Sequence, residues 1–144
     1  RRLQSESHCN LYTVMKYLAL LILVSLSTLS SAHSMSPGFK TEWAATSVHE
    51  KSYTLQNDYE HPSVYTIQVF NKDWTPASGW KVEKEQYKLL PNSKAQVKVR
   101  FKVEKHRKVI VCSTLTEIGK YYEKASIISR VCSRLIINGF GKQL

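Results

Sequence analysis

The sequence of 144 residues lacks the motifs on which most enzymes depend. It contains no G-x-S-x-G nucleophile motif, no phosphate-binding loop and no pair of carboxylates placed for acid–base catalysis. Its histidines show no metal-ligand spacing; those after residue 32 are His33, His49, His61 and His106. We therefore expect no enzymatic activity, no catalytic residue, no small-molecule substrate and no cofactor or metal ion.

Long hydrophobic runs are also scarce, and the one that exists lies near the start of the chain. It extends from Leu18 to Val24, comes shortly after the positively charged start Met15-Lys16 and precedes the small residues Ser30-Ser31-Ala32. This arrangement is typical of a bacterial secretory signal peptide, so we expect residues 15–32 to be removed by cleavage after Ala32. The alternative is a membrane anchor, which needs about 20 apolar residues. The run is shorter than that, and export to the periplasm is expected.

Residues 1–14 need a separate explanation, because they are polar and begin with Arg1 instead of methionine. Either the chain is a fragment or translation was read from too far upstream. We exclude this tail, with Cys9, from the expected fold. The remaining residues 33–144 contain no internal repeat and no low-complexity linker. They are enough for one small domain with its own core.

Acidic residues are few: 11 Asp and Glu stand against 21 Lys and Arg. A basic balance often indicates a nucleic-acid partner, but export argues against one. The lysines are also spread along the chain, from Lys81 to Lys108, as on the solvated faces of strands and turns. An acidic partner or an anionic membrane surface stays open as an alternative.

No stretch after residue 32 sustains a helical period, whereas short β-rich runs recur. The clearest is Ala95–Phe101, where Val97, Val99 and Phe101 alternate with Lys98 and Arg100. Strict alternation predicts a strand with one face in a core and the other in water. The preceding Pro-Asn-Ser predicts a turn, because proline presets φ and asparagine tolerates unusual backbone angles.

The other runs predict strands of similar length, and about seven strands are expected in total. This number favours an all-β, immunoglobulin-like β-sandwich. Loops are expected at Asn71–Gly79 and Gly119–Lys124. The remaining predicted strands are Gly38–Trp43, Lys51–Asn57, Ser63–Phe70, a short strand within Trp80–Leu90, Lys108–Leu115 and Ile127–Ile137.

Two cysteines remain after the excluded tail, Cys112 and Cys132, and they fall in the last two long predicted strands. In an immunoglobulin-like sheet these strands are antiparallel neighbours. Export to an oxidising compartment favours a disulfide between them. The alternative is a pair of buried free thiols.

Two segments, residues 52–73 and 80–101, follow one another in a recognisable order. A strand that ends in asparagine is followed by a second strand, a loop, an apolar segment closing on Pro-Asn-Ser and an alternating Val-x-Val-Arg strand. This order resembles the N-terminal immunoglobulin-like domain of the periplasmic chaperones that assemble pili by the usher pathway. The elements that carry the resemblance are Leu55-Gln56-Asn57, Tyr65–Phe70, Leu89–Ser93 and Val97–Arg100.

The resemblance implies a mechanism of binding. Such a chaperone lends the last strand of this domain to a pilus subunit whose own fold lacks a final strand, which is β-strand addition. Here that strand is expected within Ala125–Ile137, with apolar contacts from Ile127, Val131 and Leu135. Ile137 shares their face, and serines interrupt it.

The resemblance also implies a carboxylate site. In the family, one basic residue on the first strand and one on the last bind the C-terminal carboxylate of the subunit. The last-strand residue corresponds best to Arg134, with Arg130 as second choice. The first-strand residue corresponds only to Lys40, for which an ordinary solvated lysine is the alternative.

The leading hypothesis is therefore a periplasmic, chaperone-like binding module that presents its last strand to a pilus or other secreted subunit. The alternative is a structural or adhesive immunoglobulin-like component of a surface assembly. Family members carry a second domain, and their carboxylate site lies between the two domains, whereas this chain stops at Leu144. Either the reading frame is truncated, or the protein is a stand-alone relative, or its surface serves another contact. The oligomeric state stays open.

Overall fold

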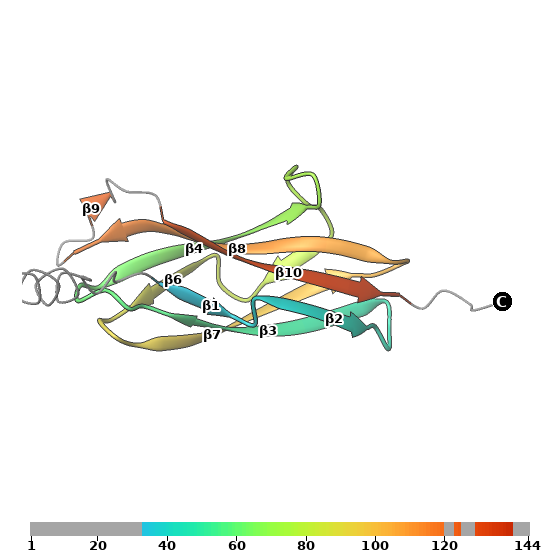
Figure 1. The fold of residues 1–144 in the computed structure, drawn as a ribbon, viewed down its shortest axis with the longest axis horizontal. Helices are drawn as coiled ribbons and strands as arrows, with labels where there is room; N and C mark the ends of the chain where they lie inside the picture. Colours follow the sequence, from blue (N-terminus) through green and yellow to red (C-terminus); the bar gives the residue numbers. More distant parts are fainter. Residues whose placement is uncertain (1–32, 120–122, 125–128, 140–144) are drawn as a thin grey trace, which may run out of the picture. The chain divides into compact units, whose positions relative to one another are not determined.

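The computed structural model describes residues 33–119, 123–124 and 129–139, all within one compact unit, Ser31–Leu144 (Figure 1). In this part of the chain no helix is long and apolar enough to cross a membrane. The predicted signal peptide and the tail before it lie outside the described residues. The strands are β1 Ser34–Ser36, β2 Phe39–Trp43, β3 Val48–Gln56, β4 Ser63–Asn71, β5 Trp80–Val82, β6 Gln86–Leu89, β7 Lys94–Lys102, β8 Arg107–Ile118, β9 Glu123–Lys124 and β10 Arg130–Asn138.

The strands form two facing sheets, which confirms the predicted immunoglobulin-like β-sandwich. One sheet has the order β1-β3-β7-β5 and the other the order β2-β10-β8-β4-β6, with the short β9 beside β8. Neighbouring strands are antiparallel except β2 and β10, which run parallel. Each predicted strand has a counterpart, and the predicted Gly38–Trp43 corresponds to β2. The short β1 was not predicted, the segment Trp80–Leu90 holds two short strands, β5 and β6, and β9 lies within the expected loop Gly119–Lys124.

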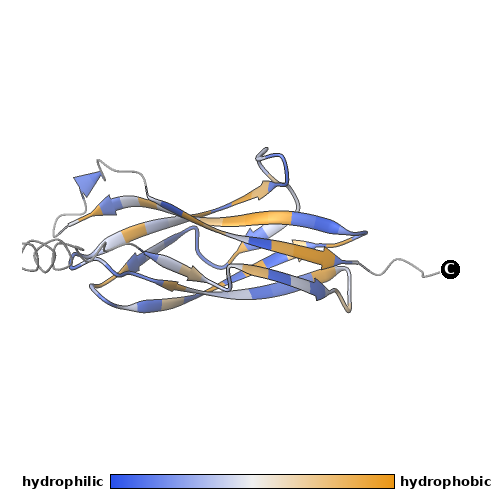
Figure 2. Ribbon diagram, viewed as in Figure 1, coloured by the Kyte–Doolittle hydropathy of each residue, from blue (hydrophilic) through white to orange (hydrophobic). Residues whose placement is uncertain are grey.

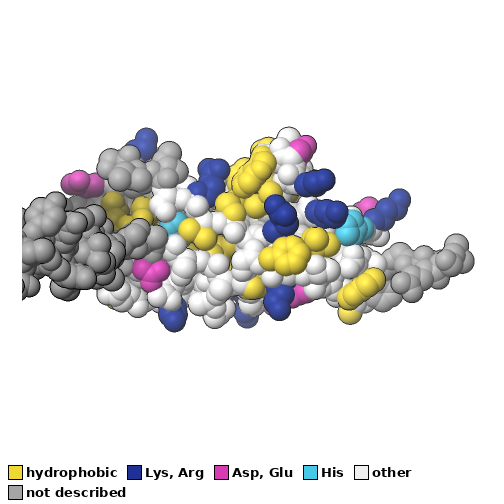
Figure 3. Space-filling model, viewed as in Figure 1, with side chains coloured by type: hydrophobic (Ala, Val, Ile, Leu, Met, Phe, Trp, Pro, Cys, Tyr) yellow, Lys and Arg dark blue, Asp and Glu magenta, His cyan; other side chains and the backbone are white. Residues whose placement is uncertain are grey.

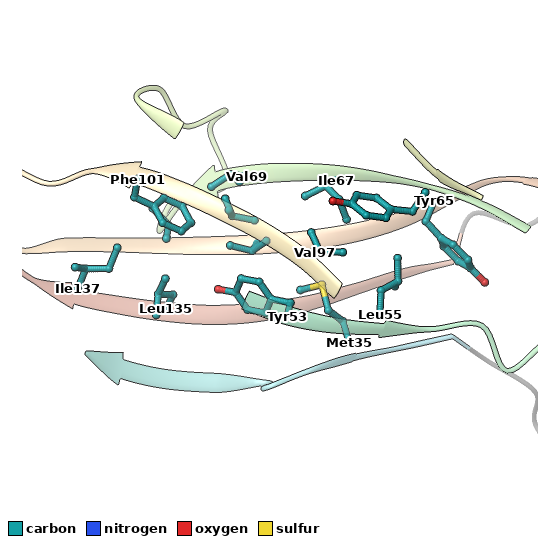
Figure 4. Packing of buried hydrophobic residues seen from close by; sticks show 14 of the residues in the cluster. Met35, Tyr53, Leu55, Tyr65, Ile67, Val69, Val97, Phe101, Leu135 and Ile137 are labelled. Carbon is teal, nitrogen blue, oxygen red and sulfur yellow. The ribbon is translucent and has the colours of Figure 1, made fainter. Parts of the chain in front are cut away.

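The alternation of residues along the strands determines which side chains enter the core. Hydrophobic and hydrophilic residues alternate along the ribbon, and Lys and Arg side chains lie on the surface (Figures 2 and 3). On β7, Val97, Val99 and Phe101 are fully buried while Lys98 and Arg100 are exposed, as predicted. The buried side chains of the two sheets meet in a single core (Figure 4).

The turn before β7 also matches the sequence analysis. Asn92 has a φ of 55°, in the left-handed region that asparagine tolerates better than most residues. The Ser93 N–H and hydroxyl both donate to the Leu90 carbonyl, at 3.2 and 2.8 Å. These bonds close the turn and direct the chain into β7.

Asn57 joins three strand ends beneath the surface. Its side chain is fully buried. The amide Nδ2 donates to the carbonyls of His61, Leu89 and Leu90, at 3.0–3.3 Å. The Oδ1 accepts from the Tyr65 hydroxyl at 2.8 Å and from the Tyr59 N–H at 3.1 Å. Because buried polar groups need such partners, Asn57 fixes the ends of β3, β4 and β6 relative to one another.

Substitutions on β7 test the orientation of this strand. We expect Phe101→Ala to lower the free energy of unfolding by about 3–5 kcal/mol, because it leaves a cavity in the core. Lys98→Ala, which changes an exposed side chain, is expected to stay within about 0.5 kcal/mol of the unchanged protein. Urea unfolding of both variants measures the difference. Similar losses in the two variants would show that the orientation is wrong.

Candidate functional site

The last strand, β10, lies between β8 and β2 in the larger sheet. Cys132 stands directly opposite Cys112 on β8, and the two form a disulfide, as predicted. The bridge closes a loop with a sequence separation of 20 residues. In the chain-entropy model such a loop stabilises the fold by about 3 kcal/mol. The disulfide therefore holds the alignment of β10 on β8.

Among the described strands, only β8 pairs with the first half of β10. The β1 segment pairs with β3 in the opposite sheet. Only after Pro37 does the chain cross to the larger sheet, where β2 pairs with β10 from Arg134 onward. The pairing starts with a bond of 3.0 Å from the Arg134 N–H to the Gly38 carbonyl. Among the described strands, none pairs with the outer side of Arg130–Ser133.

Two hydrogen bonds that point in opposite directions show which backbone groups this segment exposes. The Ser129 carbonyl accepts from the Leu115 N–H on β8 at 2.8 Å, whereas the Arg134 N–H points away from β8. Backbone groups alternate along a strand, so Arg130 and Cys132 also direct their N–H and C=O away from β8. The Cα atoms of Cys112 and Cys132 are 4.1 Å apart, which is typical of the pair type that exchanges no backbone bonds. We call Arg130–Ser133 the open edge.

His33 fixes the chain just before the open edge. Its ring is 2% exposed and lies 4.7 Å from the ring of Tyr65. Nε2 contacts the Ser113 carbonyl at 3.2 Å and the Ser113 hydroxyl at 3.1 Å. Nδ1 lies 3.2 Å from the Ser129 hydroxyl. Burial lowers the pKa of His33, although the bond to the Ser113 backbone opposes this effect. The neutral ring therefore favours the folded state.

The apolar contacts predicted for a partner need correction. Leu135 is fully buried, as is Ile137, because the odd-numbered residues of β10 face the core of this domain. Neither side chain is available to enter the groove of another protein. Val131 is half-buried and packs against the same core. The fourth predicted contact, Ile127, lies outside the described residues.

The predicted basic residues do not converge on one point. Arg130 and Arg134 are both exposed on the outer face of the sheet. The guanidinium of Arg130 lies 5.5 Å from the ring centre of Phe70, and its Nε donates to the Thr114 hydroxyl at 3.2 Å. Lys40 is opposite Leu135 in the parallel pairing, so its side chain starts from the opposite face to that of Arg134. The structure does not bring Lys40 and Arg134 together on one face.

The outer face of the larger sheet contains a hollow that the sequence does not predict. It has a volume of about 370 Å³. Residues from β2, the loop after β4, β8 and β10 line it, and Arg134 is one of them. Because these segments are far apart in the sequence, only their pairing in the sheet could have identified the hollow. Among the described residues, no group of three or more His, Cys, Asp or Glu side chains could hold a metal ion.

Many solved structures similar to this fold are usher-pathway pilus chaperones. The Salmonella enterica SafA pilin in complex with the SafB chaperone matches with a TM-score of 0.62 and 14% identity, over 80% of this chain and 58% of that chain. The Escherichia coli chaperone DraB matches with a TM-score of 0.60 and 13% identity, over 76% of this chain and 56% of that chain. This chain thus spans less than two thirds of these chaperones.

The likeness extends to a further group of proteins. The MSP family member WR4 of Caenorhabditis elegans matches with a TM-score of 0.58 and 10% identity, over 74% of this chain and 98% of that chain. No protein-family model and no curated protein sequence matches. At these identities the likeness establishes the fold, and it confirms the resemblance to chaperone domains at that level.

The buried His33 predicts a pH dependence of stability. Since its pKa is lowered in the folded state, its contribution is complete above the unfolded pKa of about 6.5 and is lost as the pH falls below that value. The loss is at most about 1.4 kcal/mol per pH unit. Urea unfolding near pH 7.5 and near pH 5.5 measures it. His33→Gln should lose less stability over this interval than the unchanged protein, and equal losses would contradict the assignment.

Proposed function

We propose that this protein is a periplasmic, chaperone-like binding module that presents the open edge of β10 to a secreted protein subunit. The observation that carries the proposal is the open edge itself. The N–H and C=O groups of Arg130 and Cys132 point away from β8 beside a segment that β2 leaves uncovered. Unpaired backbone groups of this kind are a template for an added strand.

The similar structures and the sequence support this function. Two of the similar structures are complexes of a chaperone with a pilus component, SafA pilin with SafB and the tip subunit CsuE with CsuC of Acinetobacter baumannii. The predicted signal peptide at residues 15–32 provides a route to the periplasm. The Cys112–Cys132 disulfide is of the kind that persists in an oxidising compartment. A binding module of this kind needs no catalytic activity.

The burial of the predicted contact residues supports different roles for them in this proposal. Since Leu135 faces the core, affinity would come mainly from backbone bonds at the open edge, with Ile127 as a further predicted contact. Arg134 lies at the end of the open edge and is exposed. A carboxylate of the bound subunit would form a charge-assisted hydrogen bond with it. Lys40 would have no part in this bond.

Amide hydrogen exchange tests whether the open edge is free before a partner binds. In the purified protein we expect fast exchange at Arg130 and Cys132 and slow exchange at Val131 and Ser133, because only the second pair directs its N–H groups toward β8. NMR-detected exchange resolves the individual amides. Equal protection of all four would show that another segment of the chain covers the edge.

A proline substitution tests strand addition directly. Arg130→Pro removes an outward N–H without removing a bond to β8, and proline is tolerated on strand edges. We expect it to abolish the recovery of partners from periplasmic extract while the melting temperature stays within a few degrees of the unchanged value. Arg130→Ala is the matched control, because it removes the same side chain but keeps the N–H. Undiminished recovery by a folded Arg130→Pro protein would favour a structural immunoglobulin-like component instead.

A further inference from the structure

The hollow on the outer face of the larger sheet combines apolar walls with a basic rim. Phe39 on β2 and Trp74 in the loop after β4 form its walls. Their exposed fractions are 57% and 55%. Ile110 and Ile136 line it between them, and Ile110 is only 7% exposed. Figure 3 shows hydrophobic side chains flanked by Lys and Arg on this face. We call this hollow the outer groove.

The position of Trp74 is fixed by its loop. Its φ of 67° lies in the left-handed region, which is unfavourable for a bulky residue and persists only when neighbouring contacts hold it. The Trp74 N–H donates to the Asn71 carbonyl at 3.0 Å, and its ring lies 5.8 Å from that of Phe70. The Asp73 carboxylate accepts from the Thr75 hydroxyl at 2.7 Å. The loop therefore holds a half-exposed indole beside the groove in a defined place.

The described residues that line the groove include three cations and no carboxylate. Lys72, Lys108 and Arg134 line the groove, and its lining contains no Asp or Glu. None of these three takes part in the ion pairs found among the described residues. The outer face of the other sheet differs, because there the Nε of Arg100 lies 2.6 Å from the Glu50 carboxylate. The outer groove thus combines three cations that form no ion pair among the described residues with an apolar floor.

We infer that the outer groove binds an acidic peptide segment that carries a large apolar side chain. The apolar side chain would lie between Phe39 and Trp74 on the floor formed by Ile110 and Ile136. Flanking carboxylates would meet Lys72, Lys108 and Arg134, so that ligand and groove match in both charge and polarity. Apolar burial would supply affinity, and the charges would select acidic segments over others.

Other occupants fit the groove less well. A flat bilayer would contact the protruding aromatic rings but not the recessed floor, where Ile110 is almost fully buried. A second copy of this basic chain, docked by the same face, would place the rim cations against one another. The inference does not depend on strand addition, because the groove uses side chains of the outer face, whereas strand addition uses the backbone of the open edge and, of the groove residues, only Arg134. Arg134 borders both surfaces and is left unchanged in the test.

Fluorescence polarisation with a labelled acidic heptapeptide, Asp-Glu-Asp-Phe-Asp-Glu-Asp, tests the inference in low-salt buffer. We expect Lys72→Gln/Lys108→Gln to weaken binding by about fivefold or more, because each exposed charge pair contributes a modest factor. The matched control is Lys81→Gln/Lys98→Gln on the opposite sheet, which makes the same change of net charge. The control is expected to retain the affinity of the unchanged protein within about twofold.

The apolar part of the site is tested by pairing one protein variant with one peptide variant. Replacing the central phenylalanine of the peptide by alanine should weaken binding to the unchanged protein but have little further effect on Phe39→Ala, because the two rings contact each other. Arg130→Pro and Arg130→Ala should bind the peptide equally, because they differ only in the backbone N–H, and this separates the groove from the open edge.

Several outcomes would overturn the inference. Equal losses of peptide affinity in the two double lysine variants would show that binding depends on net charge alone. Independent effects of Phe39→Ala and the peptide substitution would exclude the apolar contact. Absence of peptide binding, with Lys72- and Lys108-dependent binding to phosphatidylglycerol vesicles, would assign the face to an anionic membrane. Loss of both peptide and vesicle binding would leave the groove without this role.

Discussion

The crossing of the chain from one sheet to the other between β1 and β2 is the constraint on which the open edge depends. Pro37 has no N–H to continue the pairing of β1 with β3, and at this point the chain crosses to the larger sheet. The Ser133 hydroxyl donates to the Pro37 carbonyl, and the Arg134 N–H donates to the Gly38 carbonyl. β2 therefore reaches β10 only at Arg134. If β1 and β2 had formed one strand in the larger sheet, this strand would cover β10 along its whole length. If both had stayed in the other sheet, that edge of β10 would be open along its whole length.

The disulfide adds a second constraint, because it fixes which groups the open edge presents. A slip of one residue in the pairing of β10 with β8 would turn every side chain to the opposite face and reverse the directions of the backbone groups. The covalent link between directly opposed Cys112 and Cys132 excludes such a slip. The disulfide that stabilises the pairing of β8 with β10 therefore also holds the outward N–H of Arg130 in place.

The sequence predicts the positions of the strands well. It does not predict whether the apolar face of a strand packs against the domain's own core or against another protein. Alternation at Val97, Val99 and Phe101 is a local signal, and the core confirmed it. Alternation at Leu135 and Ile137 is equally clear, yet it shows only that one face is apolar. Whether that face meets the domain's own core or the groove of another protein depends on the opposite sheet. The parallel pairing that separates Lys40 from Arg134, and the convergence of Phe39 with Trp74, likewise arise from contacts between distant segments.

The same reasoning changes the interpretation of the positive charge. Along the sequence the cations are spread, which is typical of solvated strands. In space some are neutralised, as Lys51 is by Glu42 and Arg100 by Glu50, while Lys72, Lys108 and Arg134 gather where exposed aromatic rings also lie. Backbone bonding at the open edge depends little on the sequence of a partner. A basic, apolar groove on the neighbouring face would supply the selectivity that an added strand lacks, because it distinguishes partners by charge and by one side chain.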